Sequence, residues 1–435
     1  MLKPRFVITV FLLVTLTLQF SGCYQDKTCE FASSQFATAP AIPEGFGVNF
    51  DFTEGRPGEL KQLSAGGFRW VRTDLKWDVT EKEKGQYDFS AYDRLMGELK
   101  PYGIRALFIL DYGNPLYENG EPPRTEASIQ AFARWSVAAA THFRGQGVLW
   151  ELYNEPNHSL FWPPQPDVQE YIALALAVGR AWRKSVPDEK LIGPATSEID
   201  FDFLESCFKA GLLQYWSAVS IHPYRHSDPE TAAADYCRLR ELIRVYAPAG
   251  VTGPGDKNVT QKEIPIVASE WGYSTVWRGF SEEKQARMLA RAWLTNSANG
   301  IQLSIWYDWH DDGLDPSEAE HHFGTVSNPY KADREPVYDP KPAYLAAQTL
   351  TSFLKGYRFE RRLPLASDDD YLLVFRNGDT LRFATWTTRA AHQLLLPLPA
   401  NRYTTLGFTG EGERTTNGDQ QGLSVTLTNS PMYIR

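Results

Sequence analysis

Positive charge and long apolar segments are both scarce in this sequence of 435 residues. It has 44 Lys and Arg against 53 Asp and Glu, which gives a net charge of −9 at pH 7. An acidic surface repels phosphate backbones, so we expect no nucleic-acid partner. After residue 20, no stretch approaches the ~20 consecutive apolar residues that a membrane-spanning helix needs. The remaining chain is therefore predicted to be globular, with enough hydrophobic residues (43%) for an ordinary core.

Cysteine is also sparse, with four residues at positions 23, 29, 207 and 237. Their spacings match no metal-binding motif, and we expect neither a metal nor a cofactor. Cys207 and Cys237 fall on two consecutive predicted helices. They would pair in an oxidising compartment, but two buried free thiols fit the pattern equally well, so both arrangements remain open.

Residues 1–22 are typical of a signal peptide. Lys3 and Arg5 precede an apolar run over residues 6–20, which is too short for a comfortable membrane span. Ser21 and Gly22 come directly before Cys23, and this arrangement resembles a bacterial lipobox although Phe20 stands where Leu is usual. Lipid attachment to Cys23 and plain cleavage both remain open. We expect a protein that is secreted, periplasmic or lipid-anchored at the bacterial cell envelope, with residues 23–42 as a linker.

From residue 43 to 360, short apolar runs alternate regularly with helical patterns. Runs of this kind are typical of strands buried on both faces of a parallel sheet. The predicted strands cover residues 45–50, 68–74, 104–112, 148–154, 190–196, 216–224, 264–272 and 301–309. The predicted helices cover residues 57–66, 90–100, 128–144, 167–185, 201–213, 229–247, 281–299 and 341–355. This order predicts an α/β fold, a (β/α)8 TIM barrel. A doubly wound sheet is the alternative, but the glycines after the first strand lack the spacing of a phosphate loop.

The pattern changes in residues 361–435, where no helix is predicted. Six short strands are expected at residues 371–376, 380–386, 393–397, 402–407, 422–428 and 432–435. Asn377 and Gly378 between the first two are a hairpin signal. We predict a small antiparallel β-sandwich as a second domain.

Two glutamates stand just beyond predicted barrel strands, where this fold places its chemistry. Glu155 follows the fourth strand and Glu270 the seventh, so their side chains should face each other across one opening. Cleaving a glycosidic bond with retention needs one carboxylate as nucleophile and one carboxyl as acid, roughly 5 Å apart. Two negative charges at that distance disfavour each other, so we expect one carboxyl to stay protonated near neutral pH.

The segment WELYNEPN around Glu155 resembles the acid/base motif of clan A glycoside hydrolases, and IVASEWG around Glu270 resembles their nucleophile segment. The resemblance covers residues 45 to about 355. Within the clan, residues 68–95 resemble family 39, which includes β-xylosidases, α-L-iduronidases and hydrolases of bacterial biofilm exopolysaccharide. It implies substrate-binding roles for further residues, namely Arg72 beside the nucleophile, Asn154 on the sugar 2-OH, His222 and Tyr224 near the nucleophile, and Trp306 under the sugar. Trp271 would either contact the sugar or pack in the core.

The function expected from these residues is a retaining hydrolase of an extracytoplasmic polysaccharide or oligosaccharide. A transglycosylase on the same site and a non-catalytic carbohydrate-binding barrel are the alternatives. Trp162 would either stack on a leaving-group sugar or anchor a loop. A metal site formed by His310, Asp311 and Asp312 is not expected, because adjacent side chains rarely point together. A monomer is expected.

Overall fold

The computed structural model describes residues 39–248 and 263–435. The signal peptide predicted for residues 1–22, Cys23 and most of the linker predicted for residues 23–42 lie outside the described residues. Among the described helices, none is both long enough and apolar enough to cross a bilayer.

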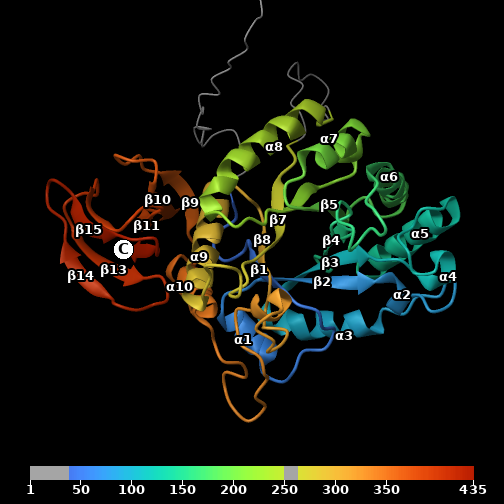
Figure 1. The fold of residues 1–435 in the computed structure, drawn as a ribbon, viewed down its shortest axis with the longest axis horizontal. Coiled ribbons are helices and arrows are strands. Elements are labelled where there is room, and N and C mark those ends of the chain that lie inside the picture. The colour runs from blue at the N-terminus through green and yellow to red at the C-terminus, as the bar shows by residue number, and fades with distance from the viewer. Residues whose placement is uncertain (1–38, 249–262) are drawn as a thin grey trace, which may run out of the picture. The chain divides into compact units, whose positions relative to one another are not determined.

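Eight parallel strands close into a barrel in chain order, as predicted (Figure 1). The barrel closes where the first strand pairs with the last, with Val48 opposite Trp306. The strands are β1 (Phe46–Asn49), β2 (Trp70–Lys76), β3 (Arg105–Asp111), β4 (Leu149–Leu152), β5 (Lys190–Ser197), β6 (Ala218–His222), β7 (Ile266–Trp271) and β8 (Ser304–Trp306). Each lies within or next to a predicted run, so the TIM-barrel prediction is confirmed.

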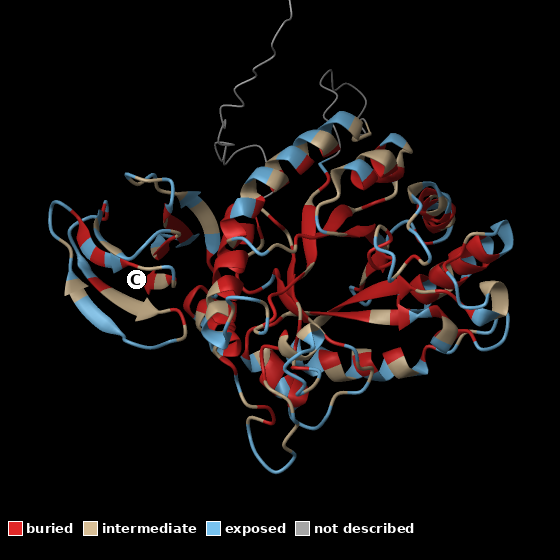
Figure 2. Cartoon of the chain, in the orientation of Figure 1, coloured by how far each residue is buried: buried red, intermediate tan, exposed pale blue. Residues whose placement is uncertain are grey.

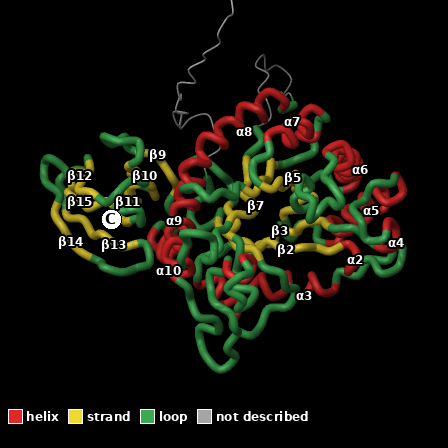
Figure 3. Tube along the Cα trace, in the orientation of Figure 1, coloured by secondary structure: helices red, strands yellow, loops and turns green. Residues whose placement is uncertain are grey.

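Helices surround the strands (Figure 3). Eight of them correspond to the predicted segments, namely α1 (Glu59–Ala65), α3 (Ser90–Leu99), α5 (Glu126–His142), α6 (Val168–Ser185), α7 (Phe201–Lys209), α8 (Ala232–Tyr246), α9 (Glu282–Ala298) and α10 (Pro342–Phe353). Two one-turn helices were not predicted, α2 (Trp77–Thr80) and α4 (Pro115–Glu118). They lie in loops that follow β2 and β3, at the end of the barrel where the site is built.

The barrel interior is filled by a compact apolar layer that includes Leu107, Ile109, Ile192, Val267 and Ile305. A second and larger apolar cluster lies between the strands and the helices. Figure 2 shows this arrangement as buried strands surrounded by helices, most of which have an exposed side, whereas α9 is buried along most of its length. The inner layer closes the barrel below its mouth, so inward-pointing polar side chains nearer the carboxyl ends of the strands form the floor of the site.

The C-terminal part is an antiparallel β-sandwich, as predicted. A six-stranded sheet in the order β14-β13-β16-β11-β10-β9 and a two-stranded sheet of β12 and β15 share one apolar core. Their bounds are β9 (Arg358–Arg362), β10 (Asp370–Asn377), β11 (Thr380–Thr387), β12 (His392–Leu396), β13 (Arg402–Gly407), β14 (Arg414–Asn417), β15 (Leu423–Leu427) and β16 (Met432–Ile434). Strands β9 and β14 were not predicted, and β9 crosses the predicted domain boundary at residue 360.

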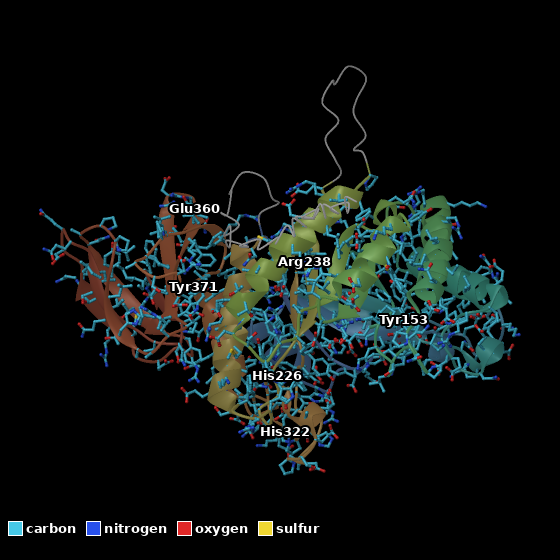
Figure 4. All side chains as sticks on the ribbon, turned by 45° about the horizontal axis from the view of Figure 1, so that its top comes forward. Tyr153, His226, Arg238, His322, Glu360 and Tyr371 are labelled. Atoms are coloured by element: carbon cyan, nitrogen blue, oxygen red, sulfur yellow. The ribbon has the colours of Figure 1, made fainter. Side chains whose placement is uncertain are left out.

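A buried polar cluster joins the sandwich to the barrel. Trp386 of β11 donates its indole N–H to the Glu230 carboxylate at 2.6 Å, and Arg291 of α9 binds the same carboxylate through two nitrogens at 2.6 and 2.7 Å. Tyr371 of β10, labelled in Figure 4, stacks on Trp386 at 4.7 Å. A charge-assisted network of this kind fixes the orientation of the groups that it joins.

The two cysteines of the described residues do not pair with each other. Cys207 is a buried free thiol, whereas Cys237 takes part in a disulfide bond. Both predicted arrangements are therefore wrong, because Cys207 and Cys237 are not joined and Cys237 is not a free thiol. Burial raises the pKa of the Cys207 thiol well above its usual value, which makes it unreactive.

Candidate active site

The chain turns sharply after β4, and this turn directs Asn154 and Glu155 toward the barrel axis. Tyr153, labelled in Figure 4, and Glu155 both have left-handed backbone conformations, with φ of 68° and 41°. The Glu155 amide donates to the Ala195 carbonyl at 3.0 Å, which holds the turn against β5. Left-handed backbone at a non-glycine residue costs of order 1 kcal/mol and is concentrated at functional sites.

Arg72 is the central cation of the site. It is 1% exposed, and its guanidinium binds Glu270 at 2.6 Å, Glu151 at 2.7 Å and the Asn154 carbonyl oxygen at 2.8 Å. Burial lowers the pKa of Arg72, but the charges of Glu151 and Glu270 raise it by more, so this side chain stays charged. The predicted contact between Arg72 and the strand-7 carboxylate is therefore present.

Glu270 has a different donor on each carboxylate oxygen. Arg72 donates to Oε2, and the Tyr224 hydroxyl donates to Oε1 at 2.8 Å. Burial and then the neighbouring Glu270 raise the pKa of Tyr224 well above its usual value, so the phenol keeps its proton and remains a donor. Two donors of this kind fix the orientation of a carboxylate that is to act as a nucleophile.

Glu155 is paired with His222, the last residue of β6. The His222 Nδ1 atom lies 2.8 Å from Oε1 of Glu155, and both residues are at most 8% exposed. Burial raises the pKa of Glu155, but the hydrogen bond with His222 and the charge of Arg72 lower it by more, and the net direction is down. The expectation that one of the two carboxyls stays protonated near neutral pH is thus not met by Glu155 in the free site, because His222 favours its ionised form.

The two glutamates meet as the sequence predicts. A carboxylate oxygen of Glu155, one of Glu270 and a ring nitrogen of His222 all lie within 4.8 Å of one another. This separation fits double displacement, in which the carboxyls are about 5–5.5 Å apart, rather than inversion, which needs room for a water at about 6.5–9.5 Å.

The same three side chains could offer ligand atoms to a metal ion. The guanidinium of Arg72 already lies 2.6 Å from Glu270 and 3.3 Å from His222, so a second cation would meet repulsion there. Asp311 is likewise engaged, because it binds Lys341 at 2.8 Å. The absence of a metal remains a prediction.

The tryptophans do not take the positions expected of a sugar platform. Trp306 is 1% exposed and packs near Tyr273, and Trp271 is 2% exposed. Trp162 is fully buried and donates its indole N–H to Glu170 at 2.8 Å, so it anchors a loop. The prediction that Trp306 lies under the sugar is therefore wrong. Side chains alternate along β8, and because Ile305 points into the barrel, Trp306 points toward the helices.

Tyr307, the residue after Trp306, is the aromatic side chain that borders the site. It is partly exposed, its hydroxyl donates to Glu320 at 2.9 Å, and the charge of Glu270 contributes to a raised pKa after burial and Asp308. The sequence did not single out Tyr307, which stood there only as part of the polar and aromatic segment 306–312, a candidate for substrate contact.

Glu151 is a second residue that sequence reasoning did not select. It lies inside β4, is completely buried and binds Arg72. The signal was a charged residue within an otherwise apolar strand, since a buried carboxylate requires a cation.

Residues 59–313 match the family model described as cellulase (glycosyl hydrolase family 5). A segment of 124 residues is 29% identical to a 6-phospho-beta-glucosidase of Dickeya chrysanthemi, and one of 131 residues is 30% identical to an endo-1,4-beta-xylanase A of Phanerodontia chrysosporium. Each match covers 27% of this chain and only 27% and 30%, respectively, of those curated relatives.

A solved structure that resembles the chain along most of its length is a family 39 glycoside hydrolase from Bacteroides cellulosilyticus. It has a TM-score of 0.76 and 24% sequence identity, over 90% of this chain and 81% of that one. At this identity the likeness shows a common fold, a TIM barrel followed by a β-sheet domain.

Proposed function

Because this chain belongs to the cellulase family of clan A glycoside hydrolases (glycosyl hydrolase family 5), we propose that it is a retaining O-glycosidase that works by double displacement. The observation that carries the proposal is the approach of Glu155 and Glu270 to within 4.8 Å, with a different set of partners on each. A pair at this distance suits a nucleophile and an acid/base that act on one sugar ring.

In the first step, Glu270 attacks the anomeric carbon while Glu155 protonates the leaving oxygen. Arg72 and Tyr224 orient the Glu270 carboxylate, and Arg72 also orients the Asn154 amide through its carbonyl oxygen. The Asn154 amide N–H is then available to the sugar 2-OH, a contact that strengthens in the transition state.

In the second step, Glu155 takes a proton from the water that releases the sugar from Glu270. The hydrogen bond from His222 favours the ionised form of Glu155, which this step requires. The proton taken from that water leaves Glu155 protonated for the next first step. If the free site loses this proton to solvent, as its lowered pKa favours, Glu155 has to take one up from solvent again before the next bond is cleaved.

The test is chemical rescue. Glu270→Gly should lower kcat on an activated aryl glycoside by at least about 10³-fold, and azide should restore turnover with a glycosyl azide of inverted configuration. The matched control is Glu44→Gly, which removes an exposed carboxylate at the opposite end of the barrel and should leave turnover unchanged. Wild-type turnover by Glu270→Gly would exclude this mechanism, and analysis of wild-type products separates hydrolysis from transglycosylation.

We further propose that the substrate is a polysaccharide or oligosaccharide outside the cytoplasm. The support is the charged and apolar N-terminal segment at residues 1–22 and the Ser21-Gly22-Cys23 sequence that follows it. Fractionation of producing cells, together with fatty-acid labelling of wild type and Cys23→Ser, tests both the location and the lipid.

A further inference from the structure

Two aspartates line the barrel mouth directly above Arg72. In the register of β2 and β3, Arg72 pairs with Leu107 and Asp74 with Ile109. Leu107 and Ile109 belong to the apolar layer inside the barrel, so the alternation of side chains also points Asp74 and Asp111 inward. Asp111 is therefore one step nearer the opening than Ile109.

Asp111 is an unusual buried group. It is 0% exposed, and neither of its carboxyl oxygens accepts a hydrogen bond from any residue that the structure describes. What it faces is the carboxylate of Asp74, with which it can bond only if one of the two carries a proton. Burial and the charge of Asp74 accordingly raise the pKa of Asp111 well above its usual value. Even when its O–H is donated to Asp74, Asp111 keeps a buried carboxyl oxygen that accepts from no described donor, and a donor carried by a substrate would satisfy this oxygen.

A second set of carboxyls lies on the β8 side of the nucleophile. Asp308 is 6% exposed, and among the described residues its carboxylate accepts only from the neighbouring Trp309 amide, at 2.5 Å. Asp51 and Asp312 are close enough to influence Asp308, as is Glu270. Within residues 39–248 and 263–435, no Lys or Arg forms an ion pair with Asp51, Asp308 or Asp312.

The positively charged side chains at this end of the site already have partners or lie too far away for a hydrogen bond. The guanidinium of Arg72 is shared among Glu151, Glu270 and Asn154. Lys76 lies 3.7 Å from Asp74, beyond hydrogen-bond distance, and is 45% exposed. Among the described residues, Asp312 likewise has only His310 as a partner, at 3.7 Å. The negative charge around the nucleophile is thus compensated only in part, and a ligand that brings a cation would compensate it further. A neutral hydroxyl would accept or donate a hydrogen bond but would leave the charge unchanged.

We propose that the sugar held beside Glu270 carries a protonated amino group, and that Asp74, supported by Asp111 and Asp308, is its recognition site. This inference rests on the proposed glycosidase function and specifies its substrate class, an amino sugar without an N-acyl group. Anionic sugars such as uronates are disfavoured by the same charges.

The test is equilibrium binding, which does not require turnover. A negative result here can therefore be distinguished from a negative result in the azide experiment. The full-length protein is titrated at pH 6 and constant ionic strength with glucosamine, galactosamine and mannosamine, and with their N-acetylated and parent neutral sugars. Ligand-observed NMR reports the dissociation constants. At least one amine should bind about tenfold more tightly than its N-acetylated and neutral counterparts, as expected for a charge-assisted contact.

Asp74→Asn should remove this preference for the amine while the affinity for the neutral sugar stays within about twofold. Asp308→Asn should reduce the same preference, and thermal unfolding checks that both variants are folded. The control is Asp188→Asn, an equal change of charge in the loop before β5, at the opposite end of the barrel, where Asp188 pairs with Arg144. The proposal is wrong if no amine binds more tightly than its N-acetylated form, or if folded Asp74→Asn keeps the preference.

Discussion

The Nε2 atom of His222 lies 3.3 Å from the Nη2 atom of Arg72. A guanidinium can only donate, so this contact is favourable only when Nε2 carries a lone pair. The proton of the neutral ring is then on Nδ1, which donates to Oε1 of Glu155 at 2.8 Å. We infer that Oε1 is occupied in both protonation states and that Oε2 carries the proton given to the leaving group. His222 is therefore a positioning residue for the acid/base.

Replacing His222 tests this role. His222→Ala removes the donor that favours ionised Glu155, so the pKa of Glu155 should rise. The first step needs protonated Glu155, so the basic limb of kcat/KM against pH should move to higher pH while the maximum falls. The control is His142→Ala, an exposed histidine on α5 paired with Asp93. A lower maximum with an unmoved basic limb would indicate a purely structural role.

The leaving group should control the pH dependence of the wild-type enzyme. The pKa of Glu155 is lowered, so the protonated fraction falls tenfold for each pH unit above it. For phenyl glycosides, which need protonation to depart, kcat/KM should rise as the pH falls from 7 toward 5. For 2,4-dinitrophenyl glycosides it should not show this basic limb, because that leaving group departs unprotonated.

Glu155→Ala provides the comparison for the same two substrates. Turnover of the phenyl glycoside should fall by about 10²–10⁴-fold, the range for loss of a general acid. The first step on the dinitrophenyl glycoside should fall far less. Identical pH profiles for both leaving groups in the wild-type enzyme would exclude Glu155 as the acid.

The barrel could be predicted from the sequence because each strand is a nearly continuous apolar run and the apolar residues of each helix recur with a helical period. Strands β9 and β14 could not, since RFERR and RTTN are short, polar segments whose pairing is set by the neighbouring strands. They become strands only because β10 and β13 present free edges to them.

The site also has features that could be predicted from the sequence and features that could not. Glu155 and Glu270 were predictable because each follows a buried strand at one end of the barrel. The state of Glu155 was not, because it depends on which atom of His222 faces it. That Tyr307 rather than Trp306 borders the site could not be predicted either. Neighbouring residues on a strand point in opposite directions, so the aromatic side chain that faces the site depends on where β8 ends.

Tyr307 and Trp306 should respond differently to truncation. Tyr307→Ala removes an aromatic face beside Glu270, and kcat/KM should fall by about 10-fold or more, as for loss of a stacking contact of ~1.5 kcal/mol, with little change in stability. Trp306→Ala empties a buried site and should cost about 3–5 kcal/mol in the free energy of unfolding. Kinetics and urea unfolding of both variants measure the two effects. Loss of stability in Tyr307→Ala without loss of activity would assign the platform to another residue.

Asp111 should make the protein less stable as the pH rises. Its pKa is raised in the folded state, so above the usual value of about 3.9 the unfolded chain has lost a proton that the folded chain still holds. The contribution of Asp111 to the free energy of unfolding is then fully present at low pH. It declines by up to about 1.4 kcal/mol per pH unit until the folded pKa is reached.

Asp111→Asn removes this dependence, because an amide cannot ionise and its N–H can donate to the Asp74 carboxylate as the carboxyl O–H does. Urea unfolding of both proteins between pH 4.5 and 8 measures their free energies of unfolding. As the pH increases, Asp111→Asn should become more stable relative to the wild type. Asp188→Asn is again the control, since Asp188 is exposed and its pKa is lowered by Arg144, so the wild-type slope should persist. Parallel curves for wild type and Asp111→Asn would mean that Asp111 is already ionised in the folded protein. The pair at the barrel mouth would then hold two negative charges rather than one.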